Sequence, residues 1–317
     1  MKKRSFFILI VLAALLVAYA LGVVKHTQWN VQSIDTMKYS RDPSREKLHD
    51  PKFDKVIDQQ LFAIAQTGAT HVGIATPYDD EFLPIMKRWV QAARKYHLKV
   101  WFRGNLSGWE GWFEYKKIDR KTHIAQTKRF ILENKELFKN GDIFTSCPEC
   151  ENGSGANFGD DVQVAQYRAF LIEEYTATKN AFKSIGKNVK ANYYSMNGDV
   201  ARRVMDRQTT KALDGIVTID HYVGTGDQLA KDIKEYAKNS GGRVVLGEFG
   251  APIPDINGPM SDAQQKAWLE DTLEKLSGLE ELEGINYWVN VGGSTAIWND
   301  NGTPKPAVET LTKFYSK

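Results

Sequence analysis

The stretch "RVVLGEFG", residues 243–250, places one carboxylate at the end of an apolar run. Short runs of apolar and β-branched residues that end at glycine predict a buried β-strand. Glu248 follows this run directly, with a glycine on each side of the Glu-Phe pair. Such a position is not typical of solvated surface, so the stretch predicts a strand that delivers Glu248 to a site.

Runs of the same kind recur along the chain and alternate with longer amphipathic segments. The predicted strands cover residues 31–36, 70–75, 99–103, 142–147, 189–194, 215–221, 243–248 and 284–289. Predicted helices between and after them include 51–67, 81–97, 122–140, 162–185, 261–276 and 306–314. Strands that alternate with helices indicate an α/β fold with a parallel sheet.

Eight such repeats with no change of composition favour a closed (β/α)8 TIM barrel over an open, doubly wound sheet. The chain has 317 residues, of which 42% are hydrophobic, and this length suits one barrel. The first strand-to-helix turn lacks a glycine-rich phosphate fingerprint, which argues against a dinucleotide-binding fold. We therefore expect a single barrel domain over residues 25–317.

The first 24 residues predict export. Lys2, Lys3 and Arg4 precede an apolar run over residues 6–24, the pattern of a signal segment. Residues 18–20, Ala-Tyr-Ala, offer a cleavage pattern, yet the run continues to about the 20 residues that span a bilayer. A cleaved signal peptide and a retained membrane anchor both stay open, and either places the barrel outside the cytoplasm.

The charge balance gives no reason to expect a nucleic-acid partner. Three of the 42 Lys and Arg residues lie at positions 2–4, and the remaining 39 equal the 39 Asp and Glu residues. A nucleic-acid-binding surface would be basic. The six His residues are scattered, so no metal site is expected, and no feature points to a cofactor. We expect a monomer.

In a TIM barrel the catalytic side chains lie where the strands end. The predicted strand ends carry Asp35, Arg103, Glu149, Glu151, Asn152, Asp220, Tyr222, Glu248 and Trp288. Glu149 and Glu248 would face each other from the fourth and seventh strands, and glycosidic bond cleavage needs two such carboxyl groups. Trp109 and Trp112 join Trp288 in predicted mouth segments, where they would either stack on sugars or pack in the rim.

These strand ends resemble the clan A retaining glycoside hydrolases, which include cellulases and β-mannanases. The resemblance covers residues 31–314 and lies in the order of Glu149, Tyr222, Glu248 and Trp288 along the strands. It implies that Glu248 is the nucleophile, kept ionised with the help of a hydrogen bond from Tyr222. It further implies that Glu149 is the general acid/base and that Trp288 floors the sugar site. Carboxyl groups about 5 Å apart would predict retention of configuration.

The sequence departs from this family before the acid/base. Pro148 stands where the family usually has an Asn that binds the sugar 2-hydroxyl, so Glu151, followed by Asn152, competes with Glu149 for the role. Asp220 stands where many members have His. Arg103 is expected to steady the carboxylates. Asp35, Arg103, Asp220, Tyr222, Trp288, Trp109, Trp112, Glu151 and Asn152 are the expected substrate-binding set.

Cys147 and Cys150 flank Pro148 and Glu149. A redox dithiol would open a helix in a cytosolic protein, whereas this pair closes a predicted strand in an exported chain. A metal would need more ligands than two thiols. A short disulfide that stiffens the turn and two free buried thiols remain as alternatives.

The substrate class is inferred from the mouth. The segment 105–121 carries Trp109, Trp112, Phe113 and Tyr115 and suggests a groove for a β-linked polysaccharide such as a mannan or glucan. Two further readings use the same residues. One is a catalytically silent barrel that binds glycans, and the other is a transglycosylase of the cell envelope.

Overall fold

A computed structural model of the chain describes residues 28–316 and contains eight parallel strands. Their order in the sheet is β4-β3-β2-β1-β8-β7-β6-β5. The strands are β1 (Val31–Asp35), β2 (His71–Ile74), β3 (Lys99–Phe102), β4 (Ile143–Phe144), β5 (Ser195–Asn197), β6 (Ile216–Asp220), β7 (Arg243–Phe249) and β8 (Leu282–Tyr287). Because β1 pairs with both β2 and β8, the two halves of the chain form one curled sheet.

The ring closes between β4 and β5 through bonds that lie outside regular strands. Ile143 forms an isolated parallel bridge with Lys190. The Phe144 amide donates to the Lys190 carbonyl at 2.8 Å, and the Lys190 amide donates to the Asp142 carbonyl at 2.9 Å. The fold is therefore that of a TIM barrel with an irregular seam between β4 and β5.

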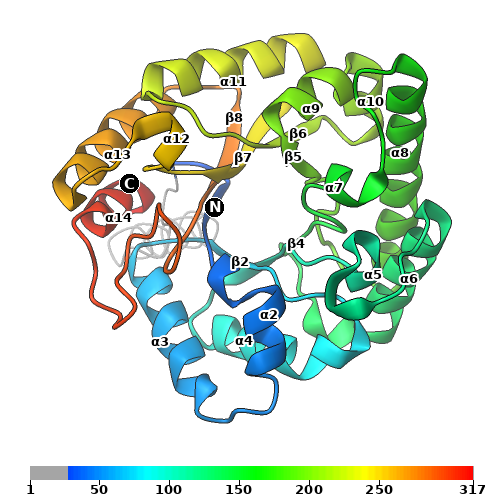
Figure 1. The fold of residues 1–317 in the computed structure, drawn as a ribbon, viewed down its shortest axis with the longest axis horizontal. Coiled ribbons are helices and arrows are strands. Elements are labelled where there is room, and N and C mark those ends of the chain that lie inside the picture. Colours follow the sequence, from blue (N-terminus) through cyan, green and yellow to red (C-terminus); the bar gives the residue numbers. More distant parts are fainter. Residues whose placement is uncertain (1–27, 317) are drawn as a thin grey trace, which may run out of the picture.

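Helices surround the strands, as Figure 1 shows. They are α2 (Arg41–Glu46), α3 (Phe53–Gln66), α4 (Leu83–Lys95), α5 (Ser107–Glu110), α6 (Arg120–Glu133), α7 (Glu151–Ser154), α8 (Asp161–Ser184), α9 (Gly198–Val204), α10 (Arg207–Ala212), α11 (Gly226–Ser240), α12 (Pro254–Asn257), α13 (Asp262–Leu276) and α14 (Ala307–Tyr315). Side-chain caps fix where several begin: Asp160 accepts from the Val162 amide, and Ser261 forms a capping box with Gln264.

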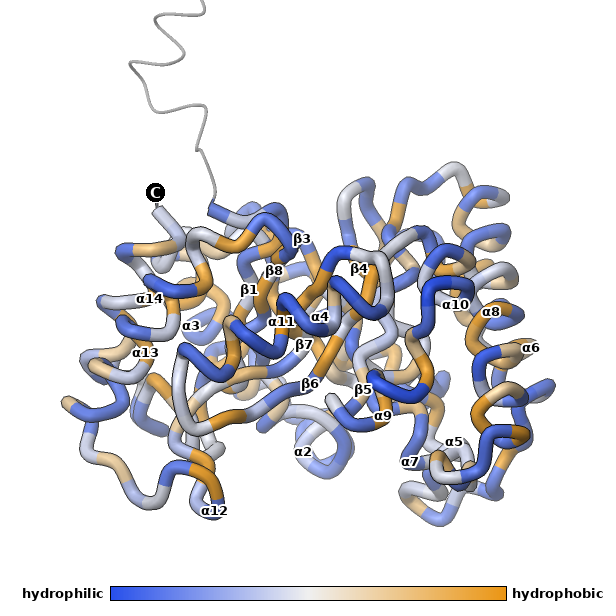
Figure 2. The backbone as a smooth tube through the Cα atoms, turned by 90° about the horizontal axis from the view of Figure 1, so that it is seen from above, coloured by the Kyte–Doolittle hydropathy of each residue, from blue (hydrophilic) through white to orange (hydrophobic). Residues whose placement is uncertain are grey.

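Two apolar layers hold the barrel together. The large layer lies between the sheet and the helices, where buried apolar residues of both pack together. Hydrophobic and hydrophilic residues alternate along the helices in Figure 2. A smaller cluster fills the barrel interior and consists of Val31, Trp101, Ile143, Tyr193 and Val245. The short helices α2, α5, α7 and α12 gather at one end of the barrel in Figure 2, and this end is the mouth where the strands finish.

The predicted fold class is confirmed, and most predicted strands match within two residues. The fourth and fifth strands are wrong in extent, since β4 has only two residues and β5 begins after the predicted 189–194 segment ends. Across this seam the Thr145 hydroxyl donates to the Tyr193 carbonyl, whereas on the other side of the segment the Asn192 side-chain amide donates to the Leu213 carbonyl ahead of β6. These bonds replace a regular ladder.

The helix predicted over 122–140 ends early. α6 stops at Glu133, and Lys135–Leu137 forms a separate 3-10 turn, because the Asn134 side chain donates to the Phe130 carbonyl and caps the last turn. The predicted signal segment, residues 1–24, lies outside the described residues. Within residues 28–316, no helix is long and apolar enough to cross a membrane.

Candidate active site

Arg103 organises the mouth of the barrel. It follows β3, and its side chain is fully buried. Its guanidinium lies 3.0 Å from Asp35 at the end of β1, 3.7 Å from Asp220 at the end of β6 and 2.7 Å from Glu248 on β7. Burial alone would lower the pKa of Arg103, but the three carboxyl groups outweigh it and raise that pKa. Arg103 is therefore a permanent cation at the centre of three strand ends.

Each carboxylate oxygen of Glu248 has its own donor. Arg103 donates to Oε1 at 2.7 Å, and the Tyr222 hydroxyl donates to Oε2 at 2.8 Å. Tyr222 also meets Trp288 edge to face, with ring centroids 6.0 Å apart. The structure thus brings together four residues that the sequence predicted for one site, and it fixes the orientation of the Glu248 carboxylate.

Burial sets the ionisation of this cluster. It raises the pKa of Asp35, and it raises that of Asp220 to about 7, against the opposing effect of Arg103. Burial also raises the pKa of Glu248, with a further contribution from Asp220. The expected help from Tyr222 is therefore not enough to lower this pKa. Three carboxyl groups share one cation, so the cluster retains a proton at pH values above the ordinary carboxyl pKa.

Glu149 lies across the mouth, on the turn that follows β4. It lines a cleft of about 380 Å³ together with Arg103, Asn105, Glu110, Trp112, Asn152, Glu248 and the segment that follows β1. The Asn152 side-chain amide donates to Glu149 Oε2 at 3.1 Å. Glu149 and Glu248 therefore open on one cleft from opposite sides of the barrel, while the predicted separation of about 5 Å stays a prediction.

Glu151 is placed differently from Glu149. Its carboxylate is buried and accepts from the backbone amide of Asn197 at 2.7 Å and from the Asn197 side chain at 3.2 Å. Burial raises the pKa of Glu151 to about 7. It does not line the cleft, so the structure assigns Glu151 to holding the end of β5, whereas Asn152 reaches the cleft as expected.

The predicted aromatic contacts divide into two groups. Trp112 lines the cleft, and Arg41 lies over its ring at 5.7 Å from the centroid. Trp109 is corrected from a substrate contact to a packing residue. It is only 1% exposed, its indole N–H donates to the Cys150 carbonyl, and its ring stacks on Phe170.

Two expected substrate contacts lie beneath the cleft. Asp35 and Asp220 are buried, contact Arg103 and do not line the cleft. Asn286 was missed: it donates to Asp35 at 3.0 Å and to the Gly247 carbonyl at 2.8 Å. A polar residue within the predicted eighth strand was the available signal.

Cys147 and Cys150 form a disulfide, which resolves the alternatives left open by the sequence. The structure adds His123 to their surroundings, with a ring nitrogen and both sulfurs within 4.8 Å of one another. His123 also lies 3.1 Å from Glu174 in a buried pair. Because the two sulfur atoms are bonded to each other, the cysteines form a crosslink in the oxidised chain and do not supply two thiolate ligands beside His123.

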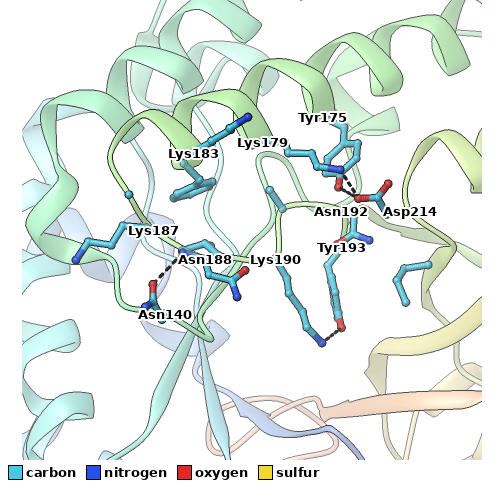
Figure 3. A pocket seen from close by; sticks show the side chains of 15 residues that line it. Asn140, Tyr175, Lys179, Lys183, Lys187, Asn188, Lys190, Asn192, Tyr193 and Asp214 are labelled. Carbon is cyan, nitrogen blue, oxygen red and sulfur yellow. Dashed lines mark hydrogen bonds and ion pairs between the residues drawn. The ribbon is translucent and has the colours of Figure 1, made fainter.

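A larger cavity of about 700 Å³ lies beside the β4–β5 seam, between the end of α8 and the segment that leads to β5 (Figure 3). Four lysines line it: Lys179, Lys183, Lys187 and Lys190. Its one lining carboxylate, Asp214, accepts from Lys179 and Tyr175, both at 2.5 Å. This cavity therefore lacks the two carboxyl groups that the predicted chemistry needs.

No protein-family model matches the chain, and the search of curated proteins finds no relative. Solved structures do resemble it. A β-glycosidase aligns with a TM-score of 0.61 at 13% identity, over 92% of this chain and 97% of that one. A family 39 glycoside hydrolase from Bacteroides cellulosilyticus WH2 aligns with a TM-score of 0.58 at 14% identity, over 91% of this chain and 64% of that one.

A β-glucuronidase from Dictyoglomus thermophilum gives a TM-score of 0.57 at 14% identity, over 91% of this chain and 51% of that one. The present chain thus spans about half the length of that enzyme. At these identities the likeness shows the fold, a TIM barrel also used by glycoside hydrolases.

Proposed function

We propose that the protein is a retaining glycoside hydrolase that cleaves a β-linked glycan. The observation that carries this proposal is one cleft lined by Glu149 and Glu248, in which Glu248 is held by Arg103 and Tyr222. Glycosidic bond cleavage needs two carboxyl groups on opposite sides of the scissile bond, one as acid and one as nucleophile or base. Glycoside hydrolases among the structural neighbours support the same reaction class.

In the first step the Glu248 carboxylate attacks the anomeric carbon, and Glu149 gives its proton to the departing glycosidic oxygen. The C–O bond to the leaving sugar breaks as the bond to Glu248 forms. In the second step Glu149 takes a proton from water, and the resulting oxygen nucleophile displaces Glu248. The two inversions return the original configuration, and Glu149 regains its proton.

The donors around Glu248 suit its ionised form, since Arg103 and Tyr222 each point an N–H or O–H at one oxygen. Among residues 28–316, no donor lies within ordinary hydrogen-bond geometry of either Asp220 oxygen, and Arg103 is 3.7 Å away. We therefore assign the retained proton of the cluster to Asp220. A neutral Asp220 leaves Arg103 free to stabilise the Glu248 carboxylate as nucleophile and as leaving group.

Access decides between the two candidates for the acid/base. Glu149 lines the cleft, whereas Glu151 is committed to Asn197 beneath it. A general acid must reach the oxygen that it protonates, and geometry takes priority over pKa in choosing it. We assign the role to Glu149. The Asn152 side-chain amide, which donates to Glu149, orients its carboxyl group.

A β-mannan or β-glucan is the proposed substrate class, with Trp112 and Trp288 as the rings that stack on sugar. The segment after β1 also brings Lys38 and Arg41 to the cleft, so acidic glycans belong among the substrates to be tested. The N-terminal segment supports a site of action outside the cytoplasm, with the chain secreted or anchored by residues 6–24. We propose a monomer without cofactor.

The test is hydrolysis of β-mannans, β-glucans and aryl β-glycosides, β-glucuronides included, by the full chain purified in detergent. Glu248→Gln and Glu149→Gln are assayed beside Glu280→Gln, which alters an exposed residue outside the cleft. Cleavage that both site variants lose and the control keeps supports the proposal. Unaltered glycan binding without cleavage by any form would instead identify a silent glycan-binding barrel. Transfer of the glycosyl group to an added sugar in preference to water would identify a transglycosylase.

A further inference from the structure

The candidate acid/base sits inside a very small covalent ring. The Cys147–Cys150 disulfide encloses only Pro148 and Glu149. The Cα atoms of the two cysteines are 5.0 Å apart, within the range that disulfides span. Both cysteines are buried, whereas Pro148 and Glu149 are partly exposed toward the cleft. The ring is therefore anchored in the core and presents one ionisable group.

The backbone of Glu149 needs such an anchor. Its φ is +44°, in the left-handed region that L-residues other than Asn and Asp rarely adopt. A residue in such a conformation persists only where its surroundings determine it. Pro148 contributes by fixing its own φ, and the Glu149 amide donates to the Ser195 carbonyl at 2.8 Å.

The far end of the ring is also tied down. The Trp109 indole donates to the Cys150 carbonyl at 2.9 Å, and the Asn152 amide donates to the Glu149 carbonyl at 2.9 Å. Both cysteines belong to the main apolar core. Strand β4 ends at Phe144 and does not reach this segment, whose bond to a neighbouring strand is the one from the Glu149 amide to Ser195 of β5. The disulfide thus holds the turn covalently at a place where β4 no longer holds it by backbone hydrogen bonds.

We propose that the Cys147–Cys150 disulfide is a positioning element that holds the Glu149 carboxyl group where it can protonate the leaving oxygen. This inference rests on the proposed hydrolase function. Without the bond the turn can relax to an ordinary backbone conformation and carry the carboxyl group out of reach. A displacement of about 1 Å at a catalytic group costs on the order of 100-fold in rate.

A purely stabilising role makes a different prediction. A crosslink stabilises mainly by restricting the unfolded chain, and this effect is smallest for the shortest loops. Global stability should therefore fall only modestly when the bond is removed, while the acid-catalysed step should change greatly. The two roles separate by substrate: a 2,4-dinitrophenyl leaving group departs without a proton, whereas a sugar or alkyl leaving group needs one.

The experiment compares the full chain with the Cys147→Ser/Cys150→Ser double variant, each with and without Glu149→Gln. The parameter is kcat/KM, which reports the first bond cleavage, for dinitrophenyl and alkyl glycosides of the same sugar. A chelator is present throughout, because any chain in which the disulfide is reduced would offer two thiols beside His123 that bind a divalent cation. Thiols are counted in denaturant before and after reduction.

We expect thiols to appear only after reduction. The double variant should lose 10-fold to 100-fold in kcat/KM on the alkyl glycoside and less than about 3-fold on the dinitrophenyl glycoside. In the Glu149→Gln background the serine substitutions should have no further effect, because the group that they position is already absent. The melting temperature of the double variant should fall, because about 2 kcal/mol of crosslink stabilisation is lost and two hydroxyl groups enter the apolar core, so the comparison of substrates is made at a temperature where both chains are folded.

Two thiols in the unreduced chain would overturn the inference. So would equal losses on both substrates, or a loss that persists undiminished in the Glu149→Gln background. If the serine variant does not fold, the parent chain is reduced and then reoxidised with oxidised glutathione, and the same leaving-group pattern must appear and reverse. A parent chain that cleaves no glycoside overturns the proposed function itself, which separates that failure from this one.

Discussion

The two sides of the cleft hold their carboxyl groups by different means. On the β7 side, Glu248 lies within a seven-residue strand. It is fixed by Arg103, which follows β3, and by Tyr222, which follows β6. On the β4 side, Glu149 follows a two-residue strand, keeps a left-handed backbone conformation and depends on a short disulfide ring. One side is built by the sheet and the other by a covalent loop.

This difference matches the work that we assign to each group. A nucleophile attacks one atom from one direction, so it gains from a rigid bed of donors around a buried carboxylate. A general acid/base must serve both the leaving group and the incoming water, which an open turn beside the cleft allows.

The largest effect is expected from Glu248→Gln, which removes the nucleophile but keeps the shape and the Arg103 contact. Loss of a covalent nucleophile lowers kcat by a factor on the order of 10⁴ or more. Steady-state hydrolysis of an aryl β-glycoside measures it, with Glu280→Gln as control. Residual activity above a hundredth of the parent value would contradict the assignment.

Glu149→Gln is expected to lower kcat/KM by about 10² to 10⁴ on a substrate with a poor leaving group. Glu151→Gln should leave the alkaline limb of the pH profile, which reports the general acid, in place and cost less than about 10-fold, because that residue supports β5 from beneath the cleft. Added azide should restore turnover to the Glu149 variant by replacing water. The reverse ranking of the two variants would transfer the acid/base role to Glu151.

Tyr222→Phe removes the hydroxyl that donates to Glu248 at 2.8 Å. A hydrogen bond to a charged group contributes about 1.5 to 3 kcal/mol, so we expect a 10-fold to 100-fold loss in kcat with little change in thermal stability. Tyr96→Phe on the outer surface is the matched control. An unchanged kcat would mean that Arg103 alone holds the nucleophile.

The smallest change concerns stability. Burial raises the pKa of Asp220 to about 7, above the value of about 3.9 in an unfolded chain. The folded protein therefore binds this proton more tightly, and stability should fall as the pH rises from about 4 to about 7. Asp220→Asn cannot ionise and should reduce this loss, so its melting temperature should improve against the parent between pH 5 and pH 8.

Exposed Asp199→Asn is the control for this comparison, since the Asp199 side chain is 99% accessible. An Asp220→Asn protein that loses stability equally at pH 5 and pH 8 would show that Asp220 does not titrate between these pH values, and would contradict the raised pKa.

The contrast between the two sides also marks how far the sequence could be read. The β7 run is apolar, β-branched and bounded by glycine, so its strand and the position of Glu248 follow from local preference. The β4–β5 seam follows from tertiary bonds instead. Thr145 bonds across it to the Tyr193 carbonyl, and no local sequence pattern predicts that partner.

The misplaced residues have a similar cause. Trp109 and Trp112 lie three positions apart in the same predicted mouth segment, and no local pattern distinguishes them. Yet Trp109 lies in the core and Trp112 lines the cleft. Burial of Asp35 and Asp220 depends on Arg103 reaching three strands at once, which only the closed barrel reveals. The disulfide likewise needed the Cα positions of both cysteines.

The most direct test of the central claim traps the glycosyl-enzyme. The full chain is incubated with the 2-deoxy-2-fluoro-β-glycosyl fluoride of its preferred sugar, which slows release of the covalent intermediate. The chain is then digested and the labelled peptide is sequenced by mass spectrometry. We predict one label per chain, on Glu248, and none in the Glu248→Gln variant. A label on Glu149 or Glu151, or turnover with no covalent intermediate, would contradict the assignment of Glu248 as nucleophile.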